Sequence, residues 1–167
     1  CKTNINGGKT TISQDGSATQ KVINISDGEL IADYGTTITA TEGVKLQGGT
    51  LKAQNGATVN NIIADEHYTG NRLVVLGGGF SSLEGTFKGS NTYRALDYNS
   101  ATALTIDGVT FDSNAAGAIY HSWSGTVDSS ISNSTFTNNS NEYDGGAYYQ
   151  FSTNGSDHAV SFNNVTF

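Results

Sequence analysis

Proline and methionine are absent from this chain of 167 residues, which has one cysteine, one tryptophan and only eight basic side chains. Because proline lacks the N–H that a central strand donates, its absence is compatible with a chain made mostly of paired strands. The single cysteine, Cys1, excludes an intrachain disulfide and a cysteine-rich zinc site. Without methionine, we expect a processed chain or a segment of a longer one. A lipidated Cys1, as in a mature bacterial lipoprotein, is an alternative to a fragment end.

Charge is sparse and mostly acidic. Charged residues make up 14% of the chain, and the formal net charge is −7. Because a phosphate-bearing partner needs a basic face, we expect no nucleic-acid partner. No apolar run reaches the length of about 18 residues that a membrane helix needs, so we expect no membrane span in this segment.

Glycine, in contrast, is abundant, with 21 residues, and the first half of the chain repeats. Equivalent apolar positions lie 21 residues apart in three pairs: Ile25 and Leu46, Leu30 and Leu51, and Ile38 and Val59. We expect a third copy at residues 73–78, aligned with residues 44–49 and displaced by a loop insertion at about residues 64–71. A short period of this kind decides the architecture before any local structure is considered.

The second half has a different repeat, marked by phenylalanines. Phe87, Phe111, Phe136 and Phe167 are separated by 24, 25 and 31 residues. Before each of the last three, apolar residues alternate with period two, and the phase changes at a polar corner such as Asp107-Gly108. A phase change at a corner means that the chain turns while the next strand faces the same interior. We therefore expect an internal phenylalanine column with outward-facing threonines beside it.

Short strands with Gly and Asn corners, repeating every 21 to 31 residues without helical periodicity, predict an all-β fold. The specific expectation is a single-stranded, right-handed parallel β-helix, which is a solenoid. Residues 1–167 should form one domain, with passenger-like 21-residue repeats over residues 1–80 and the phenylalanine repeats over residues 81–167.

One stretch carries a family resemblance. Phe136-Thr137-Asn138-Asn139, followed by Gly145-Gly146-Ala147-Tyr148-Tyr149, resembles the paired FxxN and GGA tetrapeptides of the chlamydial polymorphic membrane proteins. A degenerate copy runs from Phe111 to Asn114 and then through Ala116-Gly117-Ala118. The resemblance covers about residues 81–167 and implies a β-helical autotransporter passenger, exposed at the cell surface or outer membrane and used for adhesion to host cells. In that family the tetrapeptides are associated with adhesion.

The same motif residues also have a structural interpretation, which we favour. Phe111 and Phe136 would fill the core column. Asn114 and Asn139 would form an amide ladder at a turn, where asparagine tolerates positive φ. The glycines before Ala147 would permit a corner that side chains obstruct.

Other aromatic side chains are concentrated in the second half: Tyr93, Tyr98, Tyr120, His121, Trp123, Tyr143, Tyr148, Tyr149 and Phe151. We expect Tyr98, Tyr120 and Tyr149 on one flank, where aromatic faces stack on sugar rings or anchor a protein partner. The predicted binding residues are Tyr98, Tyr120, Trp123, Tyr148 and Tyr149, with Trp123 foremost. The alternative is that these rings stack on one another and shield the coil edges.

Evidence for catalysis or metal binding is weak. Asp65 and Glu66, in the inserted loop, are the best acid/base or metal candidates, but adjacent polar residues in a loop are usually solvated. Glu84 and Asp107 are expected to stack in one column. His121 and His158 share no motif from which a catalytic triad or a ligand set could be assembled. We therefore predict no catalytic residue, no metal and no cofactor.

The leading interpretation is a non-enzymatic adhesin or autotransporter-like passenger segment outside the cell, whose partner is a host-cell surface protein or glycan. One alternative is a structural surface subunit that assembles end to end, because an uncapped coil offers unpaired backbone groups. A second alternative is a secreted β-helix that binds or degrades polysaccharides.

Overall fold

The computed structural model describes residues 2–6, 9–12, 24–25, 29–33, 37–40, 44–46, 50–54, 58–64, 74–76, 82–91, 93–100, 102–123, 125–152 and 158–167. Within these residues the protein is all-β, and its strands form three sheets in which all the pairings are parallel. No helix in this part of the chain has the length and apolar character needed to cross a membrane. The predicted all-β, parallel architecture is confirmed.

The first sheet extends from the first strand of the described chain to the last but one. In order, its strands are β1 (Lys2–Asn6), β4 (Glu29–Asp33), β7 (Thr50–Ala53), β9 (Val74–Leu76), β11 (Leu96–Ser100), β14 (Ile119–Trp123) and β17 (Tyr148–Ser152). The strands lie across this sheet in the order in which they occur along the chain, so each strand pairs with the edge formed by the preceding strand of the sheet.

The second and third sheets are built in the same way. The second contains β2 (Lys9–Ile12), β5 (Thr37–Ala40), β8 (Thr58–Ala64), β10 (Ser82–Lys88), β13 (Val109–Asp112) and β16 (Thr135–Thr137), with β3 (Asn24–Ile25) and β6 (Val44–Leu46) beside β8. The third contains β12 (Thr105–Asp107), β15 (Ser129–Ser132) and β18 (Val160–Asn163).

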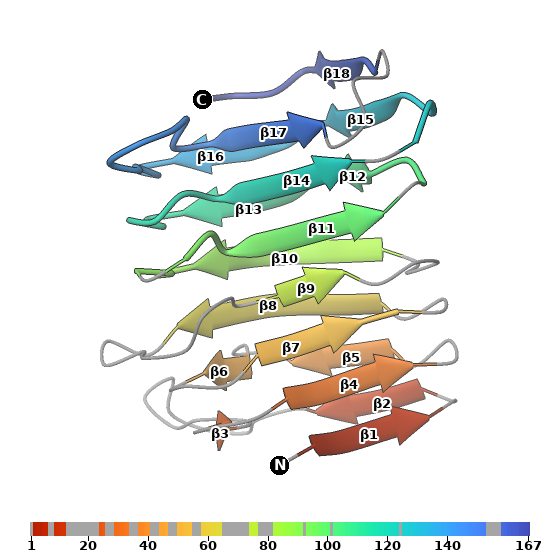
Figure 1. Ribbon diagram of the computed structural model, residues 1–167. Coiled ribbons are helices and arrows are strands. Elements are labelled where there is room, and N and C mark those ends of the chain that lie inside the picture. Colours follow the sequence, from red (N-terminus) through yellow and green to blue (C-terminus); the bar gives the residue numbers. More distant parts are fainter. Residues whose placement is uncertain are drawn as a thin grey trace.

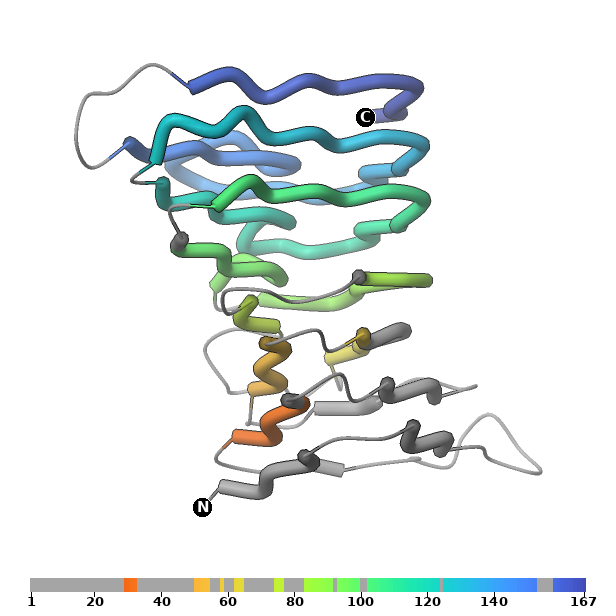
Figure 2. The backbone as a smooth tube through the Cα atoms, turned by 90° about the vertical axis from the view of Figure 1, so that its right-hand side faces the viewer, coloured from red at the N-terminus to blue at the C-terminus, as the bar shows by residue number. Residues whose placement is uncertain are grey.

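From β10 onward the chain visits the sheets in a fixed order. It passes from the second sheet to the first and then to the third, and it repeats this order through β18. We call one such passage a circuit. Figure 1 shows the strands stacked in sequence order with the two ends of the chain at opposite ends of the stack, and Figure 2 shows the same stack from the side.

The register predicted from the 21-residue repeat is confirmed where the structure describes it. Ile25 pairs with Leu46, Leu30 with Leu51, and Ile38 with Val59. Gly35 and Gly56, which are also 21 residues apart in the repeat, lie outside the described residues.

The predicted alignment of the third copy is wrong. Residues 44–46 were expected to align with residues 73–75, but Val44 pairs with Ile62 on the extended end of β8. The strand at residues 74–76 instead pairs with β7, where Leu51 lies opposite Val74. The physical reason is that β8 is long enough to pair with both β5 and β6, so it occupies the place assigned to the later copy.

The phenylalanine column is the centre of the core in the second half. Phe87, Phe111 and Phe136 are in register and buried, with ring centroids 5.5 Å and 5.0 Å apart. The ring of Phe167 stacks on Phe136 at 5.3 Å but is 68% exposed. The predicted column is thus confirmed, although its last member is not internal.

Two columns of turn residues separate the sheets. Gly108, Asn133 and Asn164 have φ of 67°, 49° and 54°, and they follow the strands of the third sheet. A second column of positive φ, at Gly89, Ser113 and Asn138, follows the strands of the second sheet. Positive φ strains most side chains, so glycine and asparagine at these corners explain why the chain turns there.

Candidate functional site

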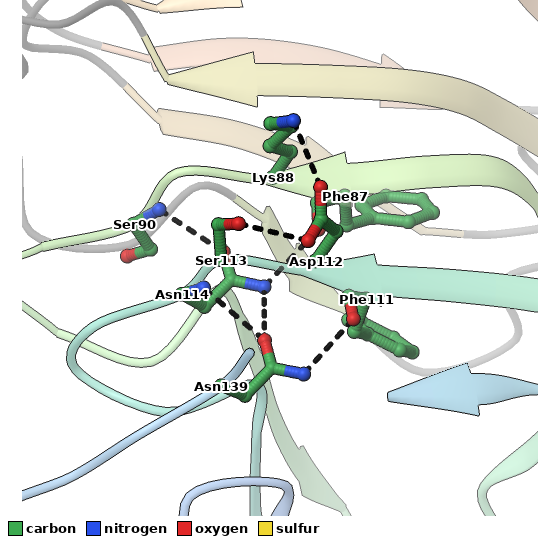
Figure 3. A network of polar contacts seen from close by, with 8 residues as sticks. All are labelled: Phe87, Lys88, Ser90, Phe111, Asp112, Ser113, Asn114 and Asn139. Atoms are coloured by element: carbon green, nitrogen blue, oxygen red, sulfur yellow. Dashed lines mark hydrogen bonds and ion pairs between the residues drawn. The ribbon is translucent and has the colours of Figure 1, made fainter. Parts of the chain in front are cut away.

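The FxxN asparagines form a ladder between circuits, shown in Figure 3. The Nδ2 of Asn114 donates to Oδ1 of Asn139 at 2.8 Å and to the carbonyl of Phe87 at 3.1 Å, and its Oδ1 accepts from the backbone N of Ser90 at 3.0 Å. Asn139 repeats the pattern, since its Nδ2 donates to the carbonyl of Phe111 at 2.9 Å. Each asparagine therefore ties its own circuit to the motif of the preceding one.

This ladder confirms the structural interpretation of FxxN, with one correction. Asn114 is fully buried and Asn139 half-buried. Positive φ does not fall on either of them but on the residue before each, Ser113 and Asn138. The motif asparagine contributes its side-chain amide to hydrogen bonds, whereas the residue before it adopts the positive φ of the turn.

The GGA segment also has a packing role. A Cβ on Gly145 would lie 2.7 Å from the carbonyl oxygen of Tyr148, and one on Gly146 would lie 2.6 Å from that of Asn139. Ala147 packs against the core, and its carbonyl accepts from the backbone N of Ile119. The predicted tight corner is confirmed.

One buried cation, Arg94, links three circuits on the flank where the chain passes from the second sheet to the first. Arg94, 7% exposed, donates from Nη1 to the carbonyl of Gly145 at 2.7 Å, and its Nη2 lies 3.6 Å from the carboxylate of Asp144. Its Cζ is 5.0 Å from the ring centroid of Tyr149. Burial lowers the pKa of Arg94, whereas the nearby Asp144 raises it. Nη1 is thus hydrogen-bonded within the protein, whereas Nη2 lies near the Asp144 carboxylate and has no hydrogen-bond partner among the described residues.

A pocket of about 620 Å³ lies on the same flank. It is lined by the connections that lead into β11, β14 and β17, at the left of the stack in Figure 1. Its aromatic members are Tyr93, Tyr120 and Tyr143, and its polar side chains are those of Asn91, Arg94, Asn141, Glu142 and Asp144. Successive circuits thus bring three tyrosines, two carboxylates and two asparagine amides into one concave surface.

The pocket wall that carries Tyr143 has a defined conformation. Asn141 donates from Nδ2 to the carbonyl of Ala116 at 2.7 Å, and its Oδ1 accepts from the backbone N of both Tyr143 and Asp144 at 3.0 Å. This asparagine turn holds the loop against the preceding circuit. Tyr143 is nevertheless 84% exposed, so a large ring is presented to solvent on an ordered loop.

The predicted binding residues separate into two groups. Tyr120 and Tyr149 stack with ring centroids 5.6 Å apart, as expected for one flank, and Tyr120 lines the pocket. Tyr98 and Trp123 are wrong as surface contacts, because they are 1% and 0% exposed.

Register explains why Tyr98 faces inward. Tyr98 pairs with His121 rather than with Tyr120, so it lies one residue out of phase with the other two flank tyrosines. Its hydroxyl is hydrogen-bonded to Thr102. Tyr148, also predicted to bind, is half-buried against the core.

An internal cluster of histidine and aromatic rings was not predicted. The Nδ1 of His121 is 2.7 Å from the hydroxyl of Tyr148, and its ring centroid is 5.5 Å from that of His158. His158 stacks on Trp123 at 3.9 Å. Among the described residues, Nε2 of His121 has no hydrogen-bond partner. The two histidines are 37 residues apart and share no motif, so no local signal indicates their contact.

Burial sets the protonation of this cluster. Desolvation, with a smaller contribution from His158, lowers the pKa of His121 to about 4. Desolvation also raises the pKa of the Tyr148 phenol. Because His121 is fully buried and neutral at pH 7, the cluster fills the interior and presents no reactive group at the surface.

The predicted acidic pair is not formed. Glu84 pairs with Asn60 in the second sheet, whereas Asp107 lies in the third sheet, in register with Ser132. Hydrogen bonds from Ser132 and Asn133, both at 2.7 Å, lower the pKa of Asp107. This carboxylate caps a corner.

The other candidates for metal or acid/base chemistry, Asp65 and Glu66, lie outside the described residues. In the part that the structure describes, no three His, Cys, Asp or Glu side chains come together as a potential metal site.

The chain matches no protein-family model, no curated protein and no solved structure. The resemblance to the chlamydial polymorphic membrane proteins therefore stays a prediction, and the function has to be argued from the pocket.

Proposed function

We propose that this chain is a segment of a right-handed parallel β-helix, of the autotransporter-passenger type, that attaches a cell surface to a host partner through the tyrosine-lined pocket. In this account the protein is extracellular and has no catalytic activity. The FxxN and GGA tetrapeptides hold successive circuits together, and the pocket makes the contact.

The order of the strands supports the β-helix. From β10 to β18 the chain repeats the same sequence of sheets, and equivalent residues such as Phe87, Phe111 and Phe136 stack in parallel register. Parallel crossover connections are right-handed in nearly all proteins, which favours that hand here.

The single observation that carries the adhesive function is the exposed tyrosine pocket. Tyr93 and Tyr143 are 49% and 84% exposed, and both line a concave surface with polar groups between them. Exposed aromatic residues that converge on a pocket are typical of binding sites, because they offer large contact area at low entropic cost. By contrast, the motif residues Asn114 and Phe111 are fully buried and offer no contact to a partner.

Attachment to host cells tests the proposal. Labelled chain should bind cells saturably, and unlabelled chain should displace it. A double variant, Tyr93→Ala with Tyr143→Ala, should displace it at least tenfold less well. Phe151→Ala is the matched control, because Phe151 is also exposed but is not part of the pocket, and it should compete like the unchanged chain. Non-saturable binding, or equal competition by the double variant, would overturn the proposal.

A second function, end-to-end assembly, has one supporting observation. Phe162 and Phe167 are 42% and 68% exposed beyond the last buried ring of the column, with their centroids 5.7 Å apart. A further parallel circuit from a second copy would cover them. Sedimentation of the chain over a hundredfold range of concentration should then show oligomers that Phe167→Asp abolishes. A monomer throughout the range would remove this alternative.

A further inference from the structure

We infer that the ligand of the tyrosine pocket is a neutral saccharide, presented as a terminal or internal part of a glycan. This inference rests on the proposed attachment function and specifies the chemistry of its partner. Aromatic exposure, polar side chains, charge and size each point to it.

The exposed rings provide the apolar surface that a sugar needs. One face of a pyranose ring carries mainly C–H groups, which pack against the face of an aromatic ring. The backbone of Tyr143 is held in place by the Asn141 turn, so the loop that carries the ring needs little further ordering when a ligand binds. Tyr120 is similarly held by its stack on Tyr149.

The remaining lining groups match a ligand rich in hydroxyls. Glu142 and Asp144 bring carboxylate oxygens, which accept hydrogen bonds, to the pocket wall, and Asn91 adds a further polar side chain to it. Such alternation of flat apolar faces with a few polar groups is the usual composition of a small-molecule site.

Charge favours a neutral sugar over an acidic one. The two carboxylates that line the pocket would repel an anionic ligand. Arg94 offsets only one of these carboxylates, because its guanidinium is buried, donates to Gly145 and faces Asp144. A sialic or uronic acid would therefore meet a lining of net negative charge, because among the described lining residues two carboxylates face one buried guanidinium.

Size favours a glycan over a folded protein. A volume of about 620 Å³ falls within the range of about 300 to 1,000 Å³ that is typical of small-ligand pockets. A stable protein complex needs roughly 800 Å² of surface on each partner, far more than a ligand confined to this pocket would cover.

A glycan array that includes neutral and sialylated structures tests the inference directly. The labelled chain should bind a subset of neutral glycans and should not require sialic acid. Tyr143→Ala should weaken binding at least tenfold, Tyr143→Phe should keep it within about threefold because the ring remains, and Phe151→Ala should leave it unchanged. Binding to acidic glycans only, no glycan bound, or no effect of Tyr143→Ala would overturn the inference.

A parallel experiment on cells separates this inference from the attachment function. Periodate, which cleaves the vicinal diols of sugars, should abolish attachment, whereas protease treatment of glycolipid-bearing cells should leave part of it. If attachment survives periodate, is lost after protease and still depends on Tyr143, the partner is a protein: the attachment function stands and the saccharide inference fails. If neutral glycans bind on the array but cells do not, the saccharide inference stands and the attachment function fails.

Discussion

The side-chain amide of Asn114 donates to the side-chain carbonyl of Asn139 at 2.8 Å, although the two residues lie 25 positions apart in sequence. This contact joins the fourth residues of two successive FxxN tetrapeptides and places these amides inside the stack rather than on its surface. A family-like signature is thereby accounted for by stability alone. The binding surface has to be sought in the connections that the motif positions.

Removing the buried amide tests that structural role. Asn114→Ala should lower the free energy of unfolding by about 3 kcal/mol, because it leaves the backbone N of Ser90 and the carbonyl of Phe87 without their buried partner. Urea unfolding followed by circular dichroism measures the change. Asn99→Ala on the exposed face of β11 is the control and should stay within about 0.5 kcal/mol. Equal midpoints for the two variants would contradict the ladder.

Two glycines should respond differently to the same substitutions. Gly146→Ala places a Cβ 2.6 Å from a backbone oxygen, so we expect a loss of about 2 to 3 kcal/mol. Gly108→Ala meets nothing within 4 Å and costs only its positive φ, about 1 kcal/mol. Asparagine separates the causes: Gly108→Asn should be close to neutral, since Asn133 and Asn164 occupy the equivalent corners, whereas Gly146→Asn should be as harmful as alanine. Thermal midpoints of the four variants decide the matter, and rescue of Gly146 by asparagine would refute the steric argument.

The phenylalanine column should have one weak member. Phe111→Ala removes a fully buried ring stacked on two others, so the loss should be about 3 to 5 kcal/mol. Phe167→Ala removes a ring that is 68% exposed and should cost less than about 1 kcal/mol. Denaturant titration of both variants checks this contrast, and similar losses at the two positions would show that Phe167 is buried in solution.

Stability should fall as the pH is lowered through the range set by His121. Its pKa is about 4 in the folded chain and 6.5 as the ordinary value, so between these two pH values the unfolded chain binds more protons. Stability from this group is therefore constant above pH 6.5 and declines toward pH 4. We expect a loss of about 3 kcal/mol, which is the free energy that corresponds to a shift from 6.5 to about 4 in a fully buried group.

The variant His121→Gln isolates this contribution. It removes the titrating ring next to Tyr148 and His158, so its stability should depend less steeply on pH between 6.5 and 4 than that of the unchanged chain. Urea midpoints at four pH values in this range give both slopes. Parallel slopes would mean that other groups cause the acid sensitivity.

The all-β architecture and much of the register were predictable because identical physical demands recur in each circuit. A buried position needs an apolar residue and a corner needs glycine or asparagine, so Leu30 with Leu51 and Phe87 with Phe111 can be aligned by eye. Prediction failed for residues 44–46, where pairing with an extended strand end follows no repeated residue type.

The candidate site was only partly predictable. The concentration of tyrosines at the corners was visible in sequence, and Tyr120 with Tyr149 was placed correctly. A shift of one residue in register turns a side chain to the other face of a strand, and this is why Tyr98 points inward. The pocket itself depends on the link between Arg94 and Gly145, 51 residues apart, which has no local signature.

The most direct test of the account compares one motif residue with one pocket residue in two measurements, the unfolding midpoint and attachment to cells per folded molecule. Phe136→Leu should lower the midpoint by an amount that corresponds to about 1 kcal/mol of unfolding free energy, because the ring is buried. It should leave attachment within twofold, because the ring does not line the pocket. Tyr143→Ala should leave the midpoint unchanged and weaken attachment at least tenfold. If Phe136→Leu weakened attachment and Tyr143→Ala did not, the division between a structural motif and a binding pocket would be contradicted.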